Sequence, residues 1–210
     1  MEKKFILTDK FVINSFGIKL FQIKCTKSFK YAQKGDFGGY VEKEGNLDQE
    51  NDAWVFGNAR VFGNARVSSN ARVSGDAWVS DNARVSGDAW VSSNARVSGD
   101  AWVSGDARVF GNARVSGDAW VSGNARVSGD ADIENDNEHC GFDGFGSCNR
   151  HTHAYMTKEK KVEIICGCFR GSIEEFEKKV EETHSGTVYE KQYKSIINVI
   201  KIKFGLTDFT

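Results

Sequence analysis

The residues best suited to metal binding or nucleophilic chemistry lie in the last third of the chain. These candidates are Cys140, Cys148, His151, His153, Cys166 and Cys168. The members of the pairs His151/His153 and Cys166/Cys168 are separated by a single residue, so each pair would point to one side of a strand. Thiolate and imidazole are preferred zinc ligands, but the spacing matches no usual paired-cysteine motif. A zinc site and small buried apolar cysteines are both open interpretations.

A cysteine–histidine nucleophile pair is a further use for these residues. It needs a base within hydrogen-bonding reach of the thiol and a third group that orients the base. The sequence offers neither a recognisable nucleophile turn nor an orienting acid beside the cysteines. We therefore predict no catalytic residues, no metal ligands and no cofactor.

The region that would position these side chains, residues 135–210, has the pattern of a small ββαα module. Residues 151–157 and 161–169 are expected to form two strands joined by a short polar turn. Ser172 and Glu175 form a capping box that begins a helix, which ends near Gly186. Its apolar stripe is Ile173, Phe176 and Val180. A second helix is expected over 188–203, with Tyr189, Tyr193, Ile196, Ile197 and Ile200 facing inward.

Most of the remaining chain is a repeat of six residues. Fourteen units run from Asn51 to Glu134, with alanine at one position of every unit and valine two residues later in all but the last, where Ile133 replaces it. Residues 45–50 form a degenerate fifteenth unit, and residues 39–44, with Val41, a weaker one. Alanine and valine would face one side of a short strand, while the residue between them faces the other.

A unit of six residues cannot close on itself, but three units make a triangular coil of eighteen. The Ser-Gly-Asn and Ser-Gly-Asp segments supply the corners, because these residue types tolerate a left-handed backbone. Residues 45–134 then form about five coils, stacked at about 4.8 Å per rung. The first 44 residues, with expected strands at 4–7 and 19–23, would form a β-rich N-terminal cap that covers one open end.

The unit resembles that of hexapeptide-repeat proteins, in which an aliphatic residue is followed four positions later by a small one, as in Val115 and Ala119. The resemblance implies a left-handed parallel β-helix. Acyltransferases of that family use a histidine base on a loop that interrupts the coils, and its carbonic anhydrases bind a metal with three histidines. Here all four histidines follow the repeat and no loop interrupts it. The sequence departs from both patterns, so we predict that the protein is not an enzyme. A diverged acyltransferase is kept as an alternative.

The outward position of the repeat holds all five tryptophans and eight arginines. A period of eighteen sorts them onto three faces. The first face carries Trp54, Arg72, Trp90, Arg108 and Arg126; the second carries Asp48, Arg66, Arg84, Trp102 and Trp120; the third carries Arg60, Trp78, Arg96, Arg114 and Asp132. Stacked arginines repel each other by about 0.8 kcal/mol in water, and an interposed indole would offer a cation–π contact instead.

These ladders are interpreted in two ways. They could stabilise the coil, or they could bind a partner, because tryptophan and arginine are enriched at binding hot spots. We choose the first face as the partner-binding surface, since aromatic and cationic residues alternate on it. Single-stranded nucleic acid also suits such residues, but the aspartates at the corners and the net charge of −1 argue against it.

The segments that flank the repeat resemble bacteriophage and prophage proteins of unknown function. The resemblance rests on Lys-Gly-Asp-Phe-Gly-Gly-Tyr-Val-Glu at residues 34–42 and on residues 165–184. It implies a non-enzymatic, phage-derived protein that binds a host protein or complex, for instance as an inhibitor of antiviral defence. A virion assembly protein and a sponge for a nucleotide signal are the alternatives. No apolar signal or membrane-spanning segment is evident, so we expect a cytoplasmic protein; a homo-oligomer is left open.

Overall fold

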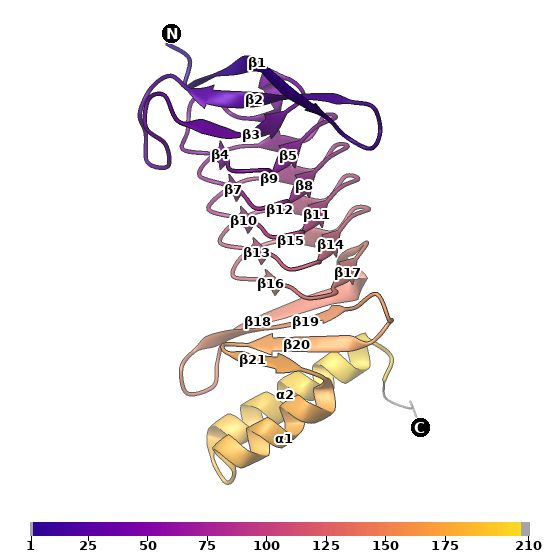
Figure 1. Ribbon diagram of the computed structural model, residues 1–210. Coiled ribbons are helices and arrows are strands. Elements are labelled where there is room, and N and C mark those ends of the chain that lie inside the picture. Colours follow the sequence, from indigo (N-terminus) through magenta and orange to yellow (C-terminus); the bar gives the residue numbers. More distant parts are fainter. Residues whose placement is uncertain (1, 207–210) are drawn as a thin grey trace.

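The computed structural model describes residues 2–206. Met1, in the predicted N-terminal cap, and residues 207–210, in the predicted C-terminal module, lie outside the described part. A shaft of short parallel strands connects an N-terminal cap of three longer strands with a C-terminal module of strands and two helices (Figure 1). The predicted architecture, a mainly β protein built on a parallel solenoid of about five coils, is confirmed. Within residues 2–206, no helix combines the length and apolarity needed to span a membrane.

The shaft is made of strands two residues long, each an outward residue followed by a buried valine or isoleucine. They are β4 (Trp54–Val55), β5 (Arg60–Val61), β6 (Arg66–Val67), β7 (Arg72–Val73), β8 (Trp78–Val79), β9 (Arg84–Val85), β10 (Trp90–Val91), β11 (Arg96–Val97), β12 (Trp102–Val103), β13 (Arg108–Val109), β14 (Arg114–Val115), β15 (Trp120–Val121), β16 (Arg126–Val127) and β17 (Asp132–Ile133).

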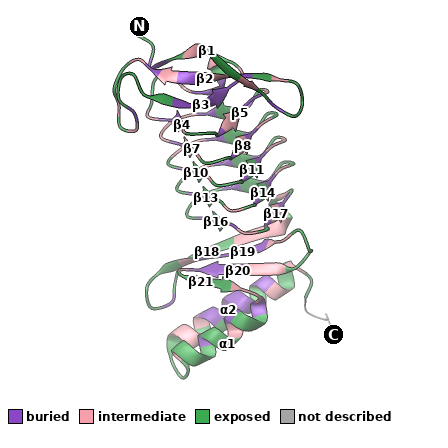
Figure 2. Ribbon diagram, viewed as in Figure 1, coloured by how far each residue is buried: buried purple, intermediate pink, exposed green. Residues whose placement is uncertain are grey.

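These strands sort into three parallel sheets with the predicted period of eighteen residues. One sheet has the order β16-β13-β10-β7-β4, the next β15-β12-β9-β6, and the third continues from the N-terminal cap through β5-β8-β11-β14-β17. Each strand pairs in register with the strand one coil away, as in Trp90 with Arg108. The alanines and valines of the repeat fill the interior as a continuous buried column (Figure 2). The three predicted faces are therefore the outer surfaces of the three sheets.

The corners of the coils depend on a left-handed residue at the first position of most units. Gly75, for example, has φ of +69° and Gly111 has φ of +74°. An added Cβ at Gly75 would lie 2.8 Å from the backbone nitrogen of Ser93 in the next coil. Ser69, Asp81 and Ser93 nevertheless occupy equivalent positions with φ near +60°. Glycine is thus favoured at these corners by both backbone conformation and close packing.

The N-terminal cap extends one sheet of the shaft. Strands β1 (Phe5–Ile13) and β2 (Lys19–Cys25) are longer than predicted, and both pair antiparallel in the order β1-β2-β3. Strand β3 (Phe37–Val41) then pairs in parallel with β5, placing Tyr40 beside Arg60. The weak unit at residues 39–44 therefore begins the first coil, which continues through the short helix η1 (Glu44–Asn46).

The C-terminal module begins after the short helix η2 (Asp136–Glu138) with a four-stranded antiparallel sheet of β18 (His139–Phe145), β19 (Arg150–Met156), β20 (Val162–Cys166) and β21 (Phe169–Gly171). The predicted ββαα arrangement is incomplete, because the prediction did not include the strand β18 that the structure contains. The predicted strand over 161–169 is also wrong in extent: Gly167, with φ of +62°, turns the chain and separates β20 from β21. Tyr155 and Ile165 join the core of the shaft and close its lower end.

The two predicted helices are confirmed at both ends. Helix α1 (Ile173–His184) begins at the Ser172/Glu175 capping box, and helix α2 (Val188–Lys203) begins after Thr187, whose side chain accepts a hydrogen bond from the Glu190 backbone. The expected inward residues of both helices are buried against the sheet, except Tyr189, which is only half-buried. Both helices lie on the side of the sheet away from the shaft (Figure 1).

Candidate functional site

The first face does not present all five of its predicted residues. The structure covers Trp54 completely: the ring centroids of Phe29 and Phe5 lie 5.3 Å and 6.3 Å from its indole, and only 2% of the residue is exposed. The prediction of Trp54 as a partner-binding residue is therefore wrong, because the N-terminal cap folds over the top rung. The exposed part of the first face extends from Trp90 to Arg126.

Trp90 is the aromatic group that remains available on this face, and its orientation is fixed. Its indole nitrogen donates a hydrogen bond of 2.9 Å to the hydroxyl of Ser74. The guanidinium of Arg72 lies 4.7 Å from the centroid of its ring, between Trp90 and the ring of Tyr31. Just over a third of Trp90 is exposed. The cation–π contact expected between Arg and Trp thus exists and holds the indole in place.

At its lower end the first face meets the C-terminal module around a polar cavity of about 500 Å³, which we call the junction cavity. The shaft contributes Asp106, Arg108, Asn124 and Arg126, and the module contributes Asp143, Cys148, Asn149, Arg150, His151 and Gly167. Two of the predicted binding residues, Arg108 and Arg126, are therefore brought together with a third arginine from a separate part of the chain.

A carboxylate in this cavity orients His151. The Nδ1 atom of His151 donates to Asp143 Oδ1 over 2.8 Å, and Asn124 donates to the same oxygen over 3.2 Å. Burial acts to raise the pKa of the Asp143 carboxyl, but the hydrogen bonds from His151 and Asn124 lower it below its ordinary value. Asp143 was missed in the sequence because it lies eight positions before His151, on the other side of a turn.

This pair does not complete a nucleophilic site with Cys148. The free nitrogen of His151, Nε2, is buried and has no hydrogen-bond partner among residues 2–206. It lies beside Gly141, where an added Cβ would be 2.9 Å away. The hydroxyl of Ser147, not the imidazole, is the polar group in contact with the Cys148 sulfur, at 3.7 Å. The imidazole of His151 is therefore not positioned to take a proton from this thiol.

Two histidines, His139 of β18 and His153 of β19, form a hydrogen-bonded chain to the last coil of the shaft. His153 Nδ1 donates to the backbone oxygen of Arg126 over 2.9 Å, and His139 Nδ1 lies 3.1 Å from His153 Nε2. This pattern fits a neutral His153 that donates at one nitrogen and accepts at the other. Burial lowers the pKa of His153 to about 3. These residues join the module to the shaft.

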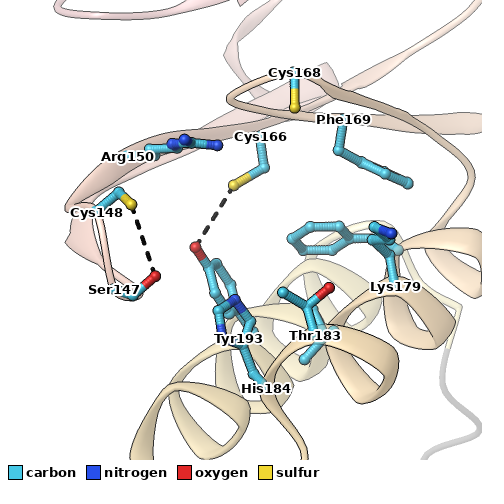
Figure 3. A pocket seen from close by; sticks show the side chains of 12 residues that line it. Ser147, Cys148, Arg150, Cys166, Cys168, Phe169, Lys179, Thr183, His184 and Tyr193 are labelled. Atoms are coloured by element: carbon cyan, nitrogen blue, oxygen red, sulfur yellow. Dashed lines mark hydrogen bonds between the residues drawn. The ribbon is translucent and has the colours of Figure 1, made fainter.

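A second cavity, of about 320 Å³, lies on the other side of Arg150, between the sheet and the two helices (Figure 3). Its polar lining includes Cys148, Cys166, Cys168 and Tyr193. The Cys166 thiol donates to the Tyr193 hydroxyl over 3.8 Å and accepts from Thr152 over 3.3 Å. Burial and the neighbouring Cys166 raise the pKa of Tyr193 to about 12. The phenol is therefore protonated at neutral pH.

The structure separates the six sequence candidates for a metal site. His151 and His153 lie against the shaft, as their shared strand face predicts, with ring centroids 5.7 Å apart. Cys166 and Cys168 instead line the cavity beside the helices, and Cys148 lines both this cavity and the junction cavity that contains His151. Cys140 is half-buried against the core of the module. Among residues 2–206, no three cysteine, histidine or acidic side chains are grouped closely enough to hold a metal ion.

Comparison with known families relates this chain to others through its repeat. The model of a family described as YdcK beta solenoid repeat matches residues 53–69, 65–80, 77–93 and 107–123. All four segments lie within the shaft and include the register of alanine and valine described above. Comparison with curated proteins finds no match for the chain. The shaft is thus similar in sequence to the repeats of that β-solenoid family.

Proposed function

We propose that this chain is a non-enzymatic binding protein that recognises a protein partner with the exposed part of its first face. The observation that carries the proposal is the fixed, exposed indole of Trp90 above Arg108 and Arg126. Ser74 and Arg72 hold this indole before any partner arrives. A rigid aromatic group loses little conformational entropy on binding, and such groups are frequent binding hot spots.

The charge of the same strip favours a partner with an acidic surface. Arg108 and Arg126 are exposed on successive rungs and share the register of their strands. Their guanidinium groups can form paired hydrogen bonds with carboxylates. The resemblance of residues 34–42 and 165–184 to phage proteins supports a bacterial host protein or complex as this partner. On this proposal the protein acts in the host cytoplasm, as an inhibitor of antiviral defence.

The test is capture of partners from a bacterial host lysate with the full chain, followed by binding measurements with the purified partner. Replacing Trp90 with Ala and Arg108 with Ser should weaken binding by about 2–4 kcal/mol if both residues are hot spots. The matched control replaces Arg84 with Ser and Trp102 with Ala on the second face. Equal losses in both double variants, or losses that follow only a lower melting temperature, would show that the ladders serve the coil alone.

A further inference from the structure

The junction cavity concentrates positive charge that the protein itself does not neutralise. Arg108 and Arg126 occupy neighbouring rungs, about 4.8 Å apart along the shaft, and Arg150 reaches the same cavity from β19. Within residues 2–206, the side chains of these three arginines have no carboxylate within 4.0 Å and form no hydrogen bond. On the upper part of the face, in contrast, the rings of Trp90 and Tyr31 flank the guanidinium of Arg72.

The two acidic side chains that line the cavity form no ion pair with its three arginines. Asp143 lines the cavity, but its Oδ1 atom accepts from both His151 and Asn124. The other acid of the lining, Asp106, is exposed at the rim and forms no ion pair with the arginines. Arg108 and Arg126, about 5 Å apart on neighbouring rungs, repel one another by about 0.8 kcal/mol even in water. An anion placed among the three guanidinium groups would relieve this repulsion.

The position of Arg150 depends on a glycine. An added Cβ at Gly167 would lie 2.5 Å from Nη1 and 2.7 Å from Cδ of Arg150. The left-handed turn at Gly167 between β20 and β21 therefore leaves the space that lets the arginine lie along the cavity wall. The lower coils thus contribute Arg108 and Arg126 to the cavity, and the turn at Gly167 leaves room for Arg150 beside them.

We propose that the junction cavity binds a small molecule that carries a phosphate group, held by Arg108, Arg126 and Arg150. Arginine pairs with phosphate through two parallel hydrogen bonds, and three arginines can surround its oxygens. The cavity volume, about 500 Å³, is within the range of small-molecule sites and exceeds the needs of inorganic phosphate. Asp106 and Asn149 at its rim can bind hydroxyl or amine groups, which a nucleoside monophosphate possesses. This ligand is distinct from the protein partner proposed above.

Titration calorimetry of the full chain at low ionic strength tests the site, with inorganic phosphate and adenosine monophosphate as probes. We expect a dissociation constant below about 1 mM for at least one probe. Tighter binding of the nucleotide would assign the site to nucleoside phosphates, and equal binding would assign it to the phosphate group alone. Arg126→Ser and Arg150→Ser should each weaken binding at least about tenfold, because each removes a charged hydrogen-bond donor.

The matched control is Arg66→Ser with Arg84→Ser, a pair on successive rungs of the second face. It should leave phosphate binding unchanged, which separates a defined site from general attraction to positive charge. Trp90→Ala should also leave it unchanged, so failure of partner binding and failure of this site are distinguishable. No binding of either probe by the folded wild-type chain, or equal binding by the Arg126/Arg150 double variant, would overturn the proposal.

Discussion

The indole rings of Trp102 and Trp120 stack nearly face to face on the second face, with centroids 5.3 Å apart and planes 8° from parallel. Their strands pair in register, and each indole nitrogen donates to a serine hydroxyl on a neighbouring rung. We expect a double-mutant cycle with Trp102→Ala and Trp120→Ala to give a coupling energy of about 0.5–1.5 kcal/mol in urea unfolding. Strictly additive losses would mean that the stack contributes nothing to stability.

Trp54 and Trp90 share a position in the repeat but should differ sharply in their contribution to stability. Trp54 is enclosed by Phe5 and Phe29, so Trp54→Ala should lower the free energy of unfolding by about 3–5 kcal/mol. Trp90→Ala removes a partly exposed ring and should cost much less. Denaturant unfolding of the two variants measures this contrast, and similar costs would contradict the covering of Trp54 by the cap.

The left-handed corners predict opposite effects of two small substitutions. Gly75→Ala should destabilise the shaft by about 1 kcal/mol or more, because the new Cβ meets the backbone of Ser93 and the residue keeps φ of +69°. Ser93→Gly should stabilise it by about 0.5–1 kcal/mol, since serine now occupies this conformation at φ of +60°. Melting temperatures test both changes. A destabilising Ser93→Gly would show that the serine side chain contributes more than its backbone strain removes.

The free energy of unfolding should decrease in acid, over the pH range between the folded and unfolded pKa values of His153. Its pKa is about 3 in the folded protein, against an ordinary value of 6.5, because the ring is buried. Between these values the unfolded chain binds a proton that the folded chain does not. The free energy of unfolding should therefore decrease as the pH falls from 6.5 towards 3, by up to about 1.4 kcal/mol per pH unit for this group.

The matched variant for this pH dependence is His153→Gln, whose amide can donate to the Arg126 oxygen and accept from His139. It should be less stable than wild type at pH 7 but lose less stability on acidification. The measurement is urea unfolding at a series of pH values. An unchanged slope in the variant would assign the acid sensitivity to other groups.

The five free cysteines should fall into two classes towards a thiol reagent. Cys148 and Cys168 are exposed and should react rapidly in the folded protein. Cys25 and Cys166 are buried, and burial raises the pKa of the half-buried Cys140 to about 11, so these three should react only on unfolding. Mass spectrometry after timed labelling measures the classes. More than two fast thiols would contradict the burial of Cys25 in the N-terminal cap or of Cys140 and Cys166 in the C-terminal module.

The shaft and both helices were predictable because their signals are local and repeated. The alternation of Ala59 and Val61 around Arg60 determines which side faces inward, and the period of eighteen then assigns each outward residue to its face. The Ser172/Glu175 capping box marks the start of α1 without any knowledge of the tertiary structure. In each case a few neighbouring residues are sufficient to specify the conformation.

The cap and the junction cavity depend instead on contacts between distant segments. Trp54 and Trp90 stand in the same local pattern, Asp-Ala-Trp-Val. The burial of Trp54 follows from the position of Phe29 in a loop whose path the repeat does not specify. Strand β18 contains two glycines and two phenylalanines without strict alternation, so its pairing with β19 had no clear signal. Arg150 meets Arg126 only because that pairing directs β19 beneath the last coil.

The number of repeat units determines both the distance between the N-terminal cap and the C-terminal module and the rotation of one relative to the other. Inserting eighteen residues would lengthen the distance between the N-terminal cap and the C-terminal module by about 4.8 Å and leave every face in line. Inserting six residues after Arg126 would move the end of the chain to the next side of the prism. Arg150 would then lie below another sheet, away from the face that carries Arg108. The number of units, taken in threes, therefore determines which side of the prism the module completes.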